Sequence, residues 1–225
     1  MNVFANPAFP DASTTLTLAG PAGAIEAVVE LPESSPRAGV AIVCHPHPLQ
    51  GGTMHNKVVT MVSRSLVELG IATVRFNFRG VGASAGEHDE GRGETDDVLA
   101  IGRWLREQRP GDALWLAGFS FGSYVAFRAA NELGVAQLIQ VAPPVGRWTF
   151  ETIAPPDCPW LVVQGEADEV VDPNAVYAWV AGFAKPPTLV RMPDTSHFFH
   201  RRLMDLRGAV KNGVRDNLPP LREPA

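Results

Sequence analysis

The sequence has few cysteines, no basic N-terminal segment and no long apolar run. Cys44 and Cys158 are too few for a disulfide framework, so both are expected to carry free thiols. The first basic residue is Arg37, which argues against a positively charged signal-peptide region and an arginine-rich transit peptide. No apolar run approaches the roughly 18 residues of a membrane span. We therefore expect a cytoplasmic protein with no membrane insertion.

The charge balance argues against one class of partner. The net charge is −5, so the chain lacks the basic footprint of a protein that binds nucleic acid. Its 225 residues are 45% hydrophobic, which suits one domain with a sizeable core. We expect a single domain over residues 1–225, with flexible tails at 1–12 and 216–225. The protein is expected to be a monomer or a homodimer.

Apolar runs of strand length alternate with segments of helical composition along the chain. Two runs at 14–18 and 24–31, separated by a glycine–proline turn, predict an antiparallel hairpin at a sheet edge. Further strands are predicted at 39–44, 71–78, 114–117, 138–142, 159–164 and 188–192, and helices at 56–69, 95–109, 123–133, 173–183 and 199–214. This alternation predicts an α/β fold with a mostly parallel, doubly wound sheet and an antiparallel N-terminal edge.

The segment around Ser120 carries the strongest chemical signal. Residues 118–122 read Gly-Phe-Ser-Phe-Gly, between the apolar run at 114–117 and the helical stretch at 123–133. A serine on such a tight strand-to-helix turn is held in a strained backbone conformation, which side chains at the flanking positions would obstruct. We interpret Ser120 as a catalytic nucleophile. The alternative is an ordinary glycine-rich turn.

A serine hydroxyl needs a neighbouring base, which is nearly always an imidazole oriented by a carboxylate. In a doubly wound sheet such groups lie in loops after the C-terminal ends of strands. His197 follows the strand at 188–192 directly and is the predicted base, whereas His200 is expected on the terminal helix. Asp168, four residues past the strand at 159–164, is the predicted acid.

Four other carboxylates lie in the same two loops. Asp172 stands directly before Pro173 and is explained as the N-cap of the following helix. Glu166, Glu169 and Asp194 are weaker candidates for the acid, because solvated loop charge accounts for them.

Backbone N–H groups must stabilise the negative oxygen that develops during acyl transfer. The first donor is expected from Phe121, which follows the nucleophile at a helix N-terminus. The second is expected from the loop at 45–53, whose two prolines have no N–H. His47, which is nearest to the end of the strand, is favoured as this donor, and Leu49 or another nearby non-proline residue is the alternative.

Two further patterns in the loops have competing interpretations. His45, His47 and His55 could bind a metal, but no carboxylate lies near them in sequence, and no metal is predicted. Residues 80–85 match a loose nucleotide-binding pattern, but an acidic loop at 86–93 follows where a helix is required, so no nucleotide is predicted.

These motifs resemble those of small, lidless bacterial serine hydrolases of the α/β-hydrolase superfamily and, more distantly, of dienelactone hydrolases. The resemblance extends from residue 25 to about residue 206. Its specific parts are His-Pro-His-Pro-Leu-Gln-Gly-Gly-Thr-Met at 45–54, Asn-Phe-Arg-Gly-Val-Gly at 77–82, Gly-Phe-Ser-Phe-Gly at 118–122, Gly-Glu-Ala-Asp at 165–168 and Ser-His-Phe-Phe at 196–199.

The resemblance implies an α/β-hydrolase fold, an ester or thioester hydrolase activity, no cofactor, and a triad of Ser120, Asp168 and His197 in the order typical of the fold. Dienelactone hydrolases use cysteine where this chain has serine, so their lactone substrate is not carried over.

The connection at 142–156 is too short for the lid domain that related folds insert there. We expect an open site, with Gln50 and Phe198 as candidates for the substrate pocket. The predicted function is a serine carboxylesterase whose partner is a small-molecule acyl ester. A thioesterase or peptidase with the same triad, and a catalytically silent binding protein, are the alternatives.

Overall fold

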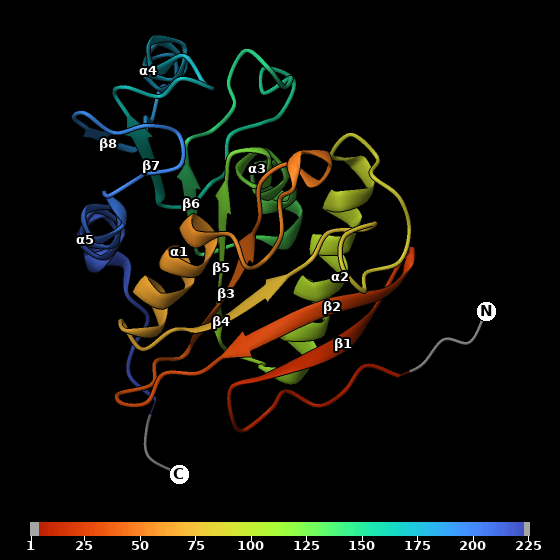
Figure 1. Ribbon diagram of the computed structural model, residues 1–225. Helices are drawn as coiled ribbons and strands as arrows, with labels where there is room; N and C mark the ends of the chain where they lie inside the picture. Colours follow the sequence, from red (N-terminus) through yellow and green to blue (C-terminus); the bar gives the residue numbers. More distant parts are fainter. Residues whose placement is uncertain (1–4, 223–225) are drawn as a thin grey trace.

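The computed structural model describes residues 5–222 and contains an eight-stranded sheet with helices on both faces (Figure 1). The strands are β1 (Thr14–Gly20), β2 (Gly23–Glu30), β3 (Gly39–Cys44), β4 (Ala72–Phe76), β5 (Ala113–Phe119), β6 (Gln137–Val141), β7 (Trp160–Gly165) and β8 (Thr188–Met192), in the order β1-β2-β4-β3-β5-β6-β7-β8. β1 pairs antiparallel with β2, as does β2 with β4, and the other neighbours are parallel. The predicted fold class is confirmed.

The helices divide between the two faces of the sheet. The helices α1 (Lys57–Val67) and α5 (Leu203–Gly213) cover one face, and α2 (Arg92–Gln108), α3 (Phe121–Leu133) and α4 (Pro173–Ala181) cover the other.

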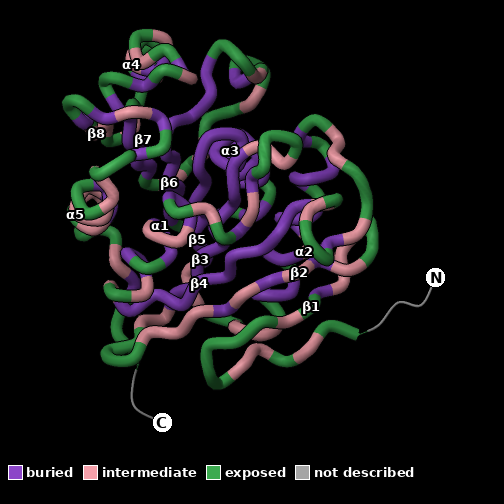
Figure 2. Tube along the Cα trace, viewed as in Figure 1, coloured by how far each residue is buried: buried purple, intermediate pink, exposed green. Residues whose placement is uncertain are grey.

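Both faces of the central strands are therefore buried, as Figure 2 shows. Successive residues of a strand point to opposite faces. Val40 and Ile42 of β3 pack in the core beneath α2 and α3, whereas Ala41 and Val43 pack beneath α1 and α5. This arrangement explains why the sequence of β3 is apolar without alternation.

The first turn of α2 differs from its prediction. The helix begins at Arg92 rather than at residue 95. The Glu94 carboxylate accepts the N–H groups of Asp89 and Gly91 at 2.9 and 2.8 Å, so it satisfies backbone donors that precede the helix.

The terminal helix also begins later than predicted. α5 starts at Leu203 rather than at residue 199, because Phe199 (φ 53°) and Arg201 (φ 59°) adopt left-handed backbone conformations that a right-handed helix excludes. His200 therefore lies exposed in the turn before α5 and not on the helix.

Residues 1–4 and 223–225 of the two predicted tails lie outside the described residues. The described parts of both segments contact the body of the protein. The Pro7 carbonyl accepts a hydrogen bond from the Trp104 indole at 2.9 Å. The Arg222 N–H donates to the Pro36 carbonyl at 2.8 Å, and its side chain pairs with Asp112.

The connection between β6 and β7 is short and packs onto the helices. Phe150 is buried there, with its ring 5.5 Å from Phe127 of α3 and 5.0 Å from Trp179 of α4. The segment forms no lid domain, as expected from its length.

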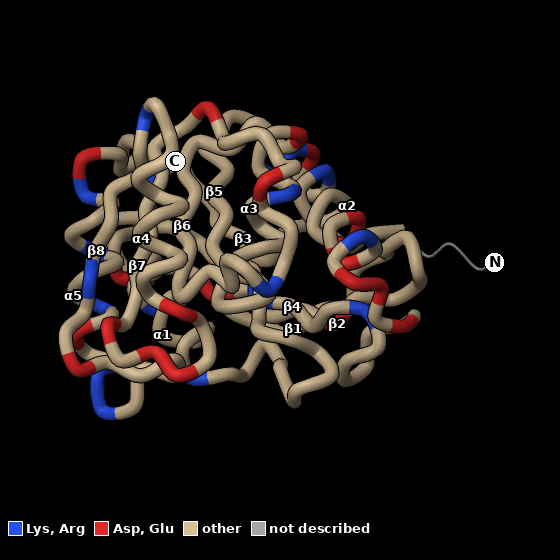
Figure 3. Tube along the Cα trace, turned by 90° about the horizontal axis from the view of Figure 1, so that it is seen from above, with Lys and Arg blue, Asp and Glu red and all other residues tan. Residues whose placement is uncertain are grey.

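Charged residues of both signs are spread around the periphery, with mostly uncharged chain in the centre of the view (Figure 3). The net charge of −5 therefore arises from dispersed side chains.

Within residues 5–222, no helix is both long enough and apolar enough to cross a membrane. Cys44 and Cys158 both carry free thiols, as expected.

Candidate active site

Ser120 occupies the turn between β5 and α3. Its backbone has φ 52° and ψ −122°, a conformation that non-glycine residues rarely adopt. The Ser120 N–H donates to the Val141 carbonyl of β6 at 2.9 Å, which ties the turn to the neighbouring strand. The strained turn expected from the sequence is present at this residue.

The flanking glycines allow this turn to close. A Cβ on Gly118 would overlap the carbonyl of Gly122, and a Cβ on Gly122 would overlap the carbonyls of Cys44 and His45 at the end of β3. Both positions therefore require glycine because of close backbone approach.

The structure brings Ser120, His197 and Asp168 into one hydrogen-bonded chain. Ser120 Oγ lies 3.1 Å from His197 Nε2, and His197 Nδ1 lies 2.9 Å from Asp168 Oδ2. All three residues are buried. An ionised carboxylate only accepts hydrogen bonds, so Nδ1 carries the proton and Nε2 is free to accept from the serine hydroxyl.

Asp168 is held by several donors. Its Oδ1 accepts the backbone N–H groups of Val170 and Val171 at 2.9 and 2.8 Å. Burial alone raises the pKa of this carboxyl, but the hydrogen bonds from His197 and the two backbone donors outweigh burial, and the pKa lies below its usual value. Asp168 is therefore ionised when it faces His197.

The competing carboxylates have other partners. Asp172 caps α4, with its Oδ1 accepting the Asn174 N–H at 2.9 Å, as predicted. Glu166 pairs with Arg191 at 2.8 Å. Glu169 accepts the backbone N–H of His197 at 3.1 Å and so supports the loop of the proposed base. The fourth, Asp194, lies exposed in the turn after β8.

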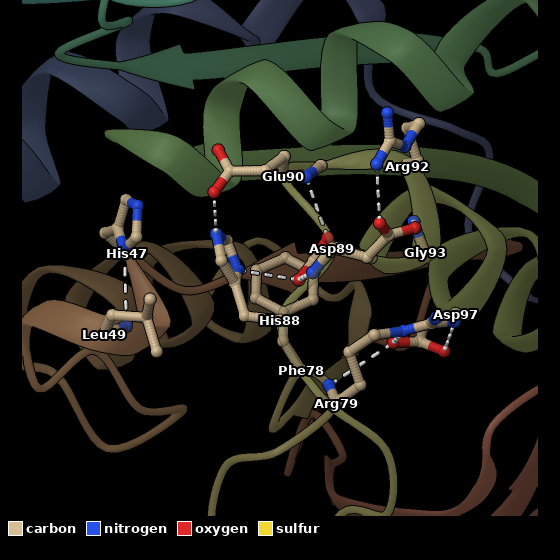
Figure 4. Close-up of polar contacts among 12 residues, drawn as sticks. His47, Leu49, Phe78, Arg79, His88, Asp89, Glu90, Arg92, Gly93 and Asp97 are labelled. Atoms are coloured by element: carbon tan, nitrogen blue, oxygen red, sulfur yellow. Dashed lines mark hydrogen bonds and ion pairs between the residues drawn. The ribbon is translucent and has the colours of Figure 1, made fainter.

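The loop after β3 lies beside the N-terminus of α3. The His47 ring lies 5.0 Å from the Phe121 ring, and its Nδ1 accepts the Leu49 N–H at 3.2 Å (Figure 4). The Leu49 N–H is therefore already engaged. The Leu49 side chain is 74% exposed, and Gln50 is also exposed in the same short turn.

His45 anchors this loop from within the core. Its Nε2 accepts the Phe78 N–H at 3.0 Å, and its Nδ1 lies 2.6 Å from the Pro46 carbonyl, so both ring nitrogens have partners inside the chain. Asn77 holds the other end of the loop, because its Oδ1 accepts the Met54 N–H at 2.9 Å. Within residues 5–222, no cluster of three or more His, Cys, Asp or Glu side chains could hold a metal ion.

His45 gives the fold a specific pH dependence. Burial lowers the pKa of His45 from 6.5 to about 4. The unfolded chain therefore binds a proton that the folded chain excludes, and stability falls as the pH drops from 6.5 towards 4. The expected loss from this residue is about 3 kcal/mol.

Denaturant unfolding measured across this pH range checks the expectation. In the variant His45→Gln, whose amide can both donate and accept, the free energy of unfolding should fall less steeply with acidification, whatever its value at neutral pH. An unchanged slope would show that other groups take up the proton.

The sequence did not indicate that His88 packs beside His47 or that Glu94 contacts His88. The His88 ring lies 4.8 Å from the His47 ring (Figure 4). The Nδ1 atom of His88 lies 2.8 Å from the carboxylate of the buried Glu94. The neighbouring loop is fixed by an ion pair between the half-buried Arg79 and the buried Asp97, with Arg79 Nη2 2.8 Å from Asp97 Oδ1. The acidic composition of residues 86–93 predicted only that the loop would not bind a nucleotide, and nothing in it indicated these partners.

The last predicted pocket residue lies beside the proposed base. Phe198 is 50% exposed, and its ring lies 5.0 Å from the His197 ring. Together with Leu49 it places apolar surface on the two loops that approach Ser120. For Gln50, a place in the substrate pocket stays a prediction.

Comparison with known proteins identifies similar chains of nearly the same length. The chain matches the family model described as "Alpha/beta hydrolase domain" over residues 42–212. A crystal structure from Xanthomonas campestris, described as an a/b serine hydrolase without lid, is 58% identical, covers 96% of this chain and 100% of its own, and has a TM-score of 0.93. An alpha-beta serine hydrolase homologue from Coxiella burnetii is 44% identical, covers 92% and 100%, and has a TM-score of 0.89. An uncharacterised protein of Rickettsia prowazekii is 32% identical over an alignment of 203 residues that covers 86% of this chain and 85% of that protein.

Proposed function

We propose that this chain, which belongs to the alpha/beta hydrolase domain family, is a serine carboxylesterase. It would cleave short-chain esters through an acyl-enzyme intermediate. The observation that carries the proposal is the hydrogen-bonded chain from Ser120 through His197 to Asp168, at 3.1 and 2.9 Å. A strained serine next to an imidazole oriented by a carboxylate is the arrangement that activates a hydroxyl as a nucleophile.

In this proposal His197 acts first as a base and then as an acid. Nε2 takes the proton of the Ser120 hydroxyl while Oγ attacks the acyl carbonyl, and Asp168 stabilises the resulting imidazolium. The imidazolium then protonates the leaving alcohol oxygen. A water molecule, deprotonated by the same imidazole, hydrolyses the acyl-enzyme and regenerates the serine hydroxyl.

Two backbone N–H groups are proposed to stabilise the tetrahedral oxyanion. Phe121 is the first residue of α3, where an N–H has no partner within the helix. For the second donor we favour His47 over Leu49, because the Leu49 N–H already donates to the His47 ring. The nucleophile, base and oxyanion donors all come from the chain, so the mechanism needs no cofactor.

The surroundings of Ser120 favour a short acyl group. The connection at 142–156 forms no lid domain, and the Leu49 and Phe198 side chains are exposed. An open site offers little apolar surface to a long chain, and binding energy depends on the surface that becomes buried. Gln50 is a proposed contact at the rim.

The proposal is tested by active-site labelling followed by a substrate series. We expect a fluorophosphonate probe to label Ser120, and kcat/KM to be higher for acetyl and butyryl p-nitrophenyl esters than for the octanoyl ester. An acyl-CoA or a peptide anilide that is cleaved faster than every ester would replace the esterase with a thioesterase or a peptidase. A chain that is folded but neither labelled nor active would be a binding protein instead.

A further inference from the structure

A buried glutamine lies beside the proposed acid. Gln164 is at the end of β7, and its side chain is fully buried. Its Nε2 donates to Asp168 Oδ2 at 3.0 Å and to the Gly165 carbonyl at 3.1 Å. Its Oε1 is buried as well and has no hydrogen-bond partner among the described residues. The amide is therefore satisfied on its donor side only.

The two oxygens of the Asp168 carboxylate have different partners. Oδ1 accepts only from the backbone, through Val170 and Val171. Oδ2 is shared by the Gln164 amide and the His197 ring, at 3.0 and 2.9 Å. Gln164 therefore contacts the same oxygen that orients the proposed base.

The orientation of the Gln164 amide follows from its acceptors. Rotation of the amide by half a turn would place Oε1 against the Asp168 carboxylate and the Gly165 carbonyl, and the negative charge on these oxygens would repel it. In the observed orientation the chain leaves a carbonyl oxygen buried without a partner, which is costly. An apolar side chain of the same length would fill the space without that cost, so packing alone does not account for a glutamine here.

We propose that Gln164 is a positioning residue for the ester hydrolysis, which holds Asp168 Oδ2 in line with His197 Nδ1 and stabilises its negative charge. The inference rests on the proposed function, because it assumes that Asp168 orients the catalytic base. Gln164 acts only through Asp168 and does not touch the serine.

The titratable groups around the Asp168 carboxylate are few. His197 faces Oδ2 from the loop after β8, and Glu169 accepts the backbone N–H of His197 from the loop after β7. Burial raises the pKa of Asp168, but the hydrogen bonds from His197, Val171 and Val170 outweigh burial and keep it below the usual value. Loss of one donor makes the carboxylate a stronger base, and its hold on a protonated imidazole becomes tighter.

The variant Gln164→Met tests the proposal, because methionine has a similar length and lacks the donor. For a short p-nitrophenyl ester we expect kcat to fall by about tenfold to a hundredfold, as for a lost hydrogen bond to a charged group. KM should be unchanged, since Gln164 contacts Asp168 and not the substrate. The acid limb of the kcat/KM profile should move to higher pH.

Two further variants separate positioning from a structural role. Gln137 is a buried glutamine on β6 whose Nε2 donates to the Leu138 carbonyl at 2.9 Å and whose Oε1 accepts from Asn217 at 2.9 Å. Gln137→Met should lower the unfolding midpoint and leave kcat and the pH profile unchanged. Gln164→Glu should regain activity over Gln164→Met at low pH, where a protonated carboxyl can donate to Oδ2, and lose it as that carboxyl ionises.

The outcomes distinguish this inference from the proposed function. Wild-type kcat and an unshifted pH profile in Gln164→Met would overturn the positioning role. A loss of kcat with an unshifted profile and a lowered unfolding midpoint, as in a merely structural role, would overturn it as well. If the wild-type protein is neither labelled at Ser120 nor active on any ester, the proposed function fails on its own.

Discussion

Replacement of Ser120 by alanine is expected to abolish ester turnover almost completely. Ser120 Oγ is the atom that His197 Nε2 faces at 3.1 Å, and alanine removes it. Without a nucleophile, only binding and the oxyanion donors can accelerate attack by water. The expected loss in kcat is about 10⁶-fold, as for the nucleophile of other serine triads. Initial rates on p-nitrophenyl acetate measure the loss, and the fluorophosphonate probe should no longer label the protein.

Ser123 provides the matched control for this variant. It is buried three residues further along, in the first turn of α3, and its hydroxyl donates to the Ser120 carbonyl at 2.7 Å. Ser123→Ala removes a hydroxyl of the same kind but no nucleophile, so activity should stay within about tenfold of the wild type, as expected for one neutral hydrogen bond. If Ser120→Ala kept activity comparable to that of Ser123→Ala, the nucleophile assignment would be wrong.

Asp168→Asn is expected to lower kcat by about 10⁴-fold, as when the acid of other triads is replaced by its amide. The reason lies in the donors that surround the carboxylate. The N–H groups of Val170 and Val171 require an acceptor at the Oδ1 position, which the amide oxygen of asparagine would fill. The NH₂ group would then face His197 Nδ1.

An NH₂ group in that place reverses the histidine tautomer. His197 Nδ1 would have to accept, its proton would move to Nε2, and Nε2 could no longer take the proton of Ser120. Asp172→Asn is the control, because asparagine caps a helix as well as aspartate does and activity should not change. Near-wild-type kcat in Asp168→Asn, with a large loss in Glu169→Gln, would instead assign the orienting role to Glu169.

The sequence predicted most of the fold because its signals are local. A continuous apolar run such as 39–44 indicates a strand buried on both faces, and the observed β3 has these bounds. Asp172 before Pro173 predicted a helix N-cap from adjacent residues alone, and that cap is present. The start of α2 was predicted wrongly, because Glu94 satisfies donors that belong to the preceding loop.

The candidate site was only partly accessible to the same reasoning. The glycines on both sides of Ser120 identify the turn, since their spacing is a property of one short segment. The sequence separates the carboxylate partner of His197 less sharply, because Glu166, Asp168 and Glu169 lie within one loop and no local pattern distinguishes them.

From the sequence alone it is possible to predict the succession of strands and helices along the chain, the strained serine turn and the two loops that should supply its partners. These features depend on residues close together in the chain, whose conformational preferences act locally. The folded chain is needed to see that Asp168 lies within hydrogen-bond distance of His197, that the Leu49 N–H donates to His47, and that the Gln164 amide donates to Asp168. Those contacts depend on the order of the strands within the sheet and on side chains from separate loops, which meet only when the sheet is assembled.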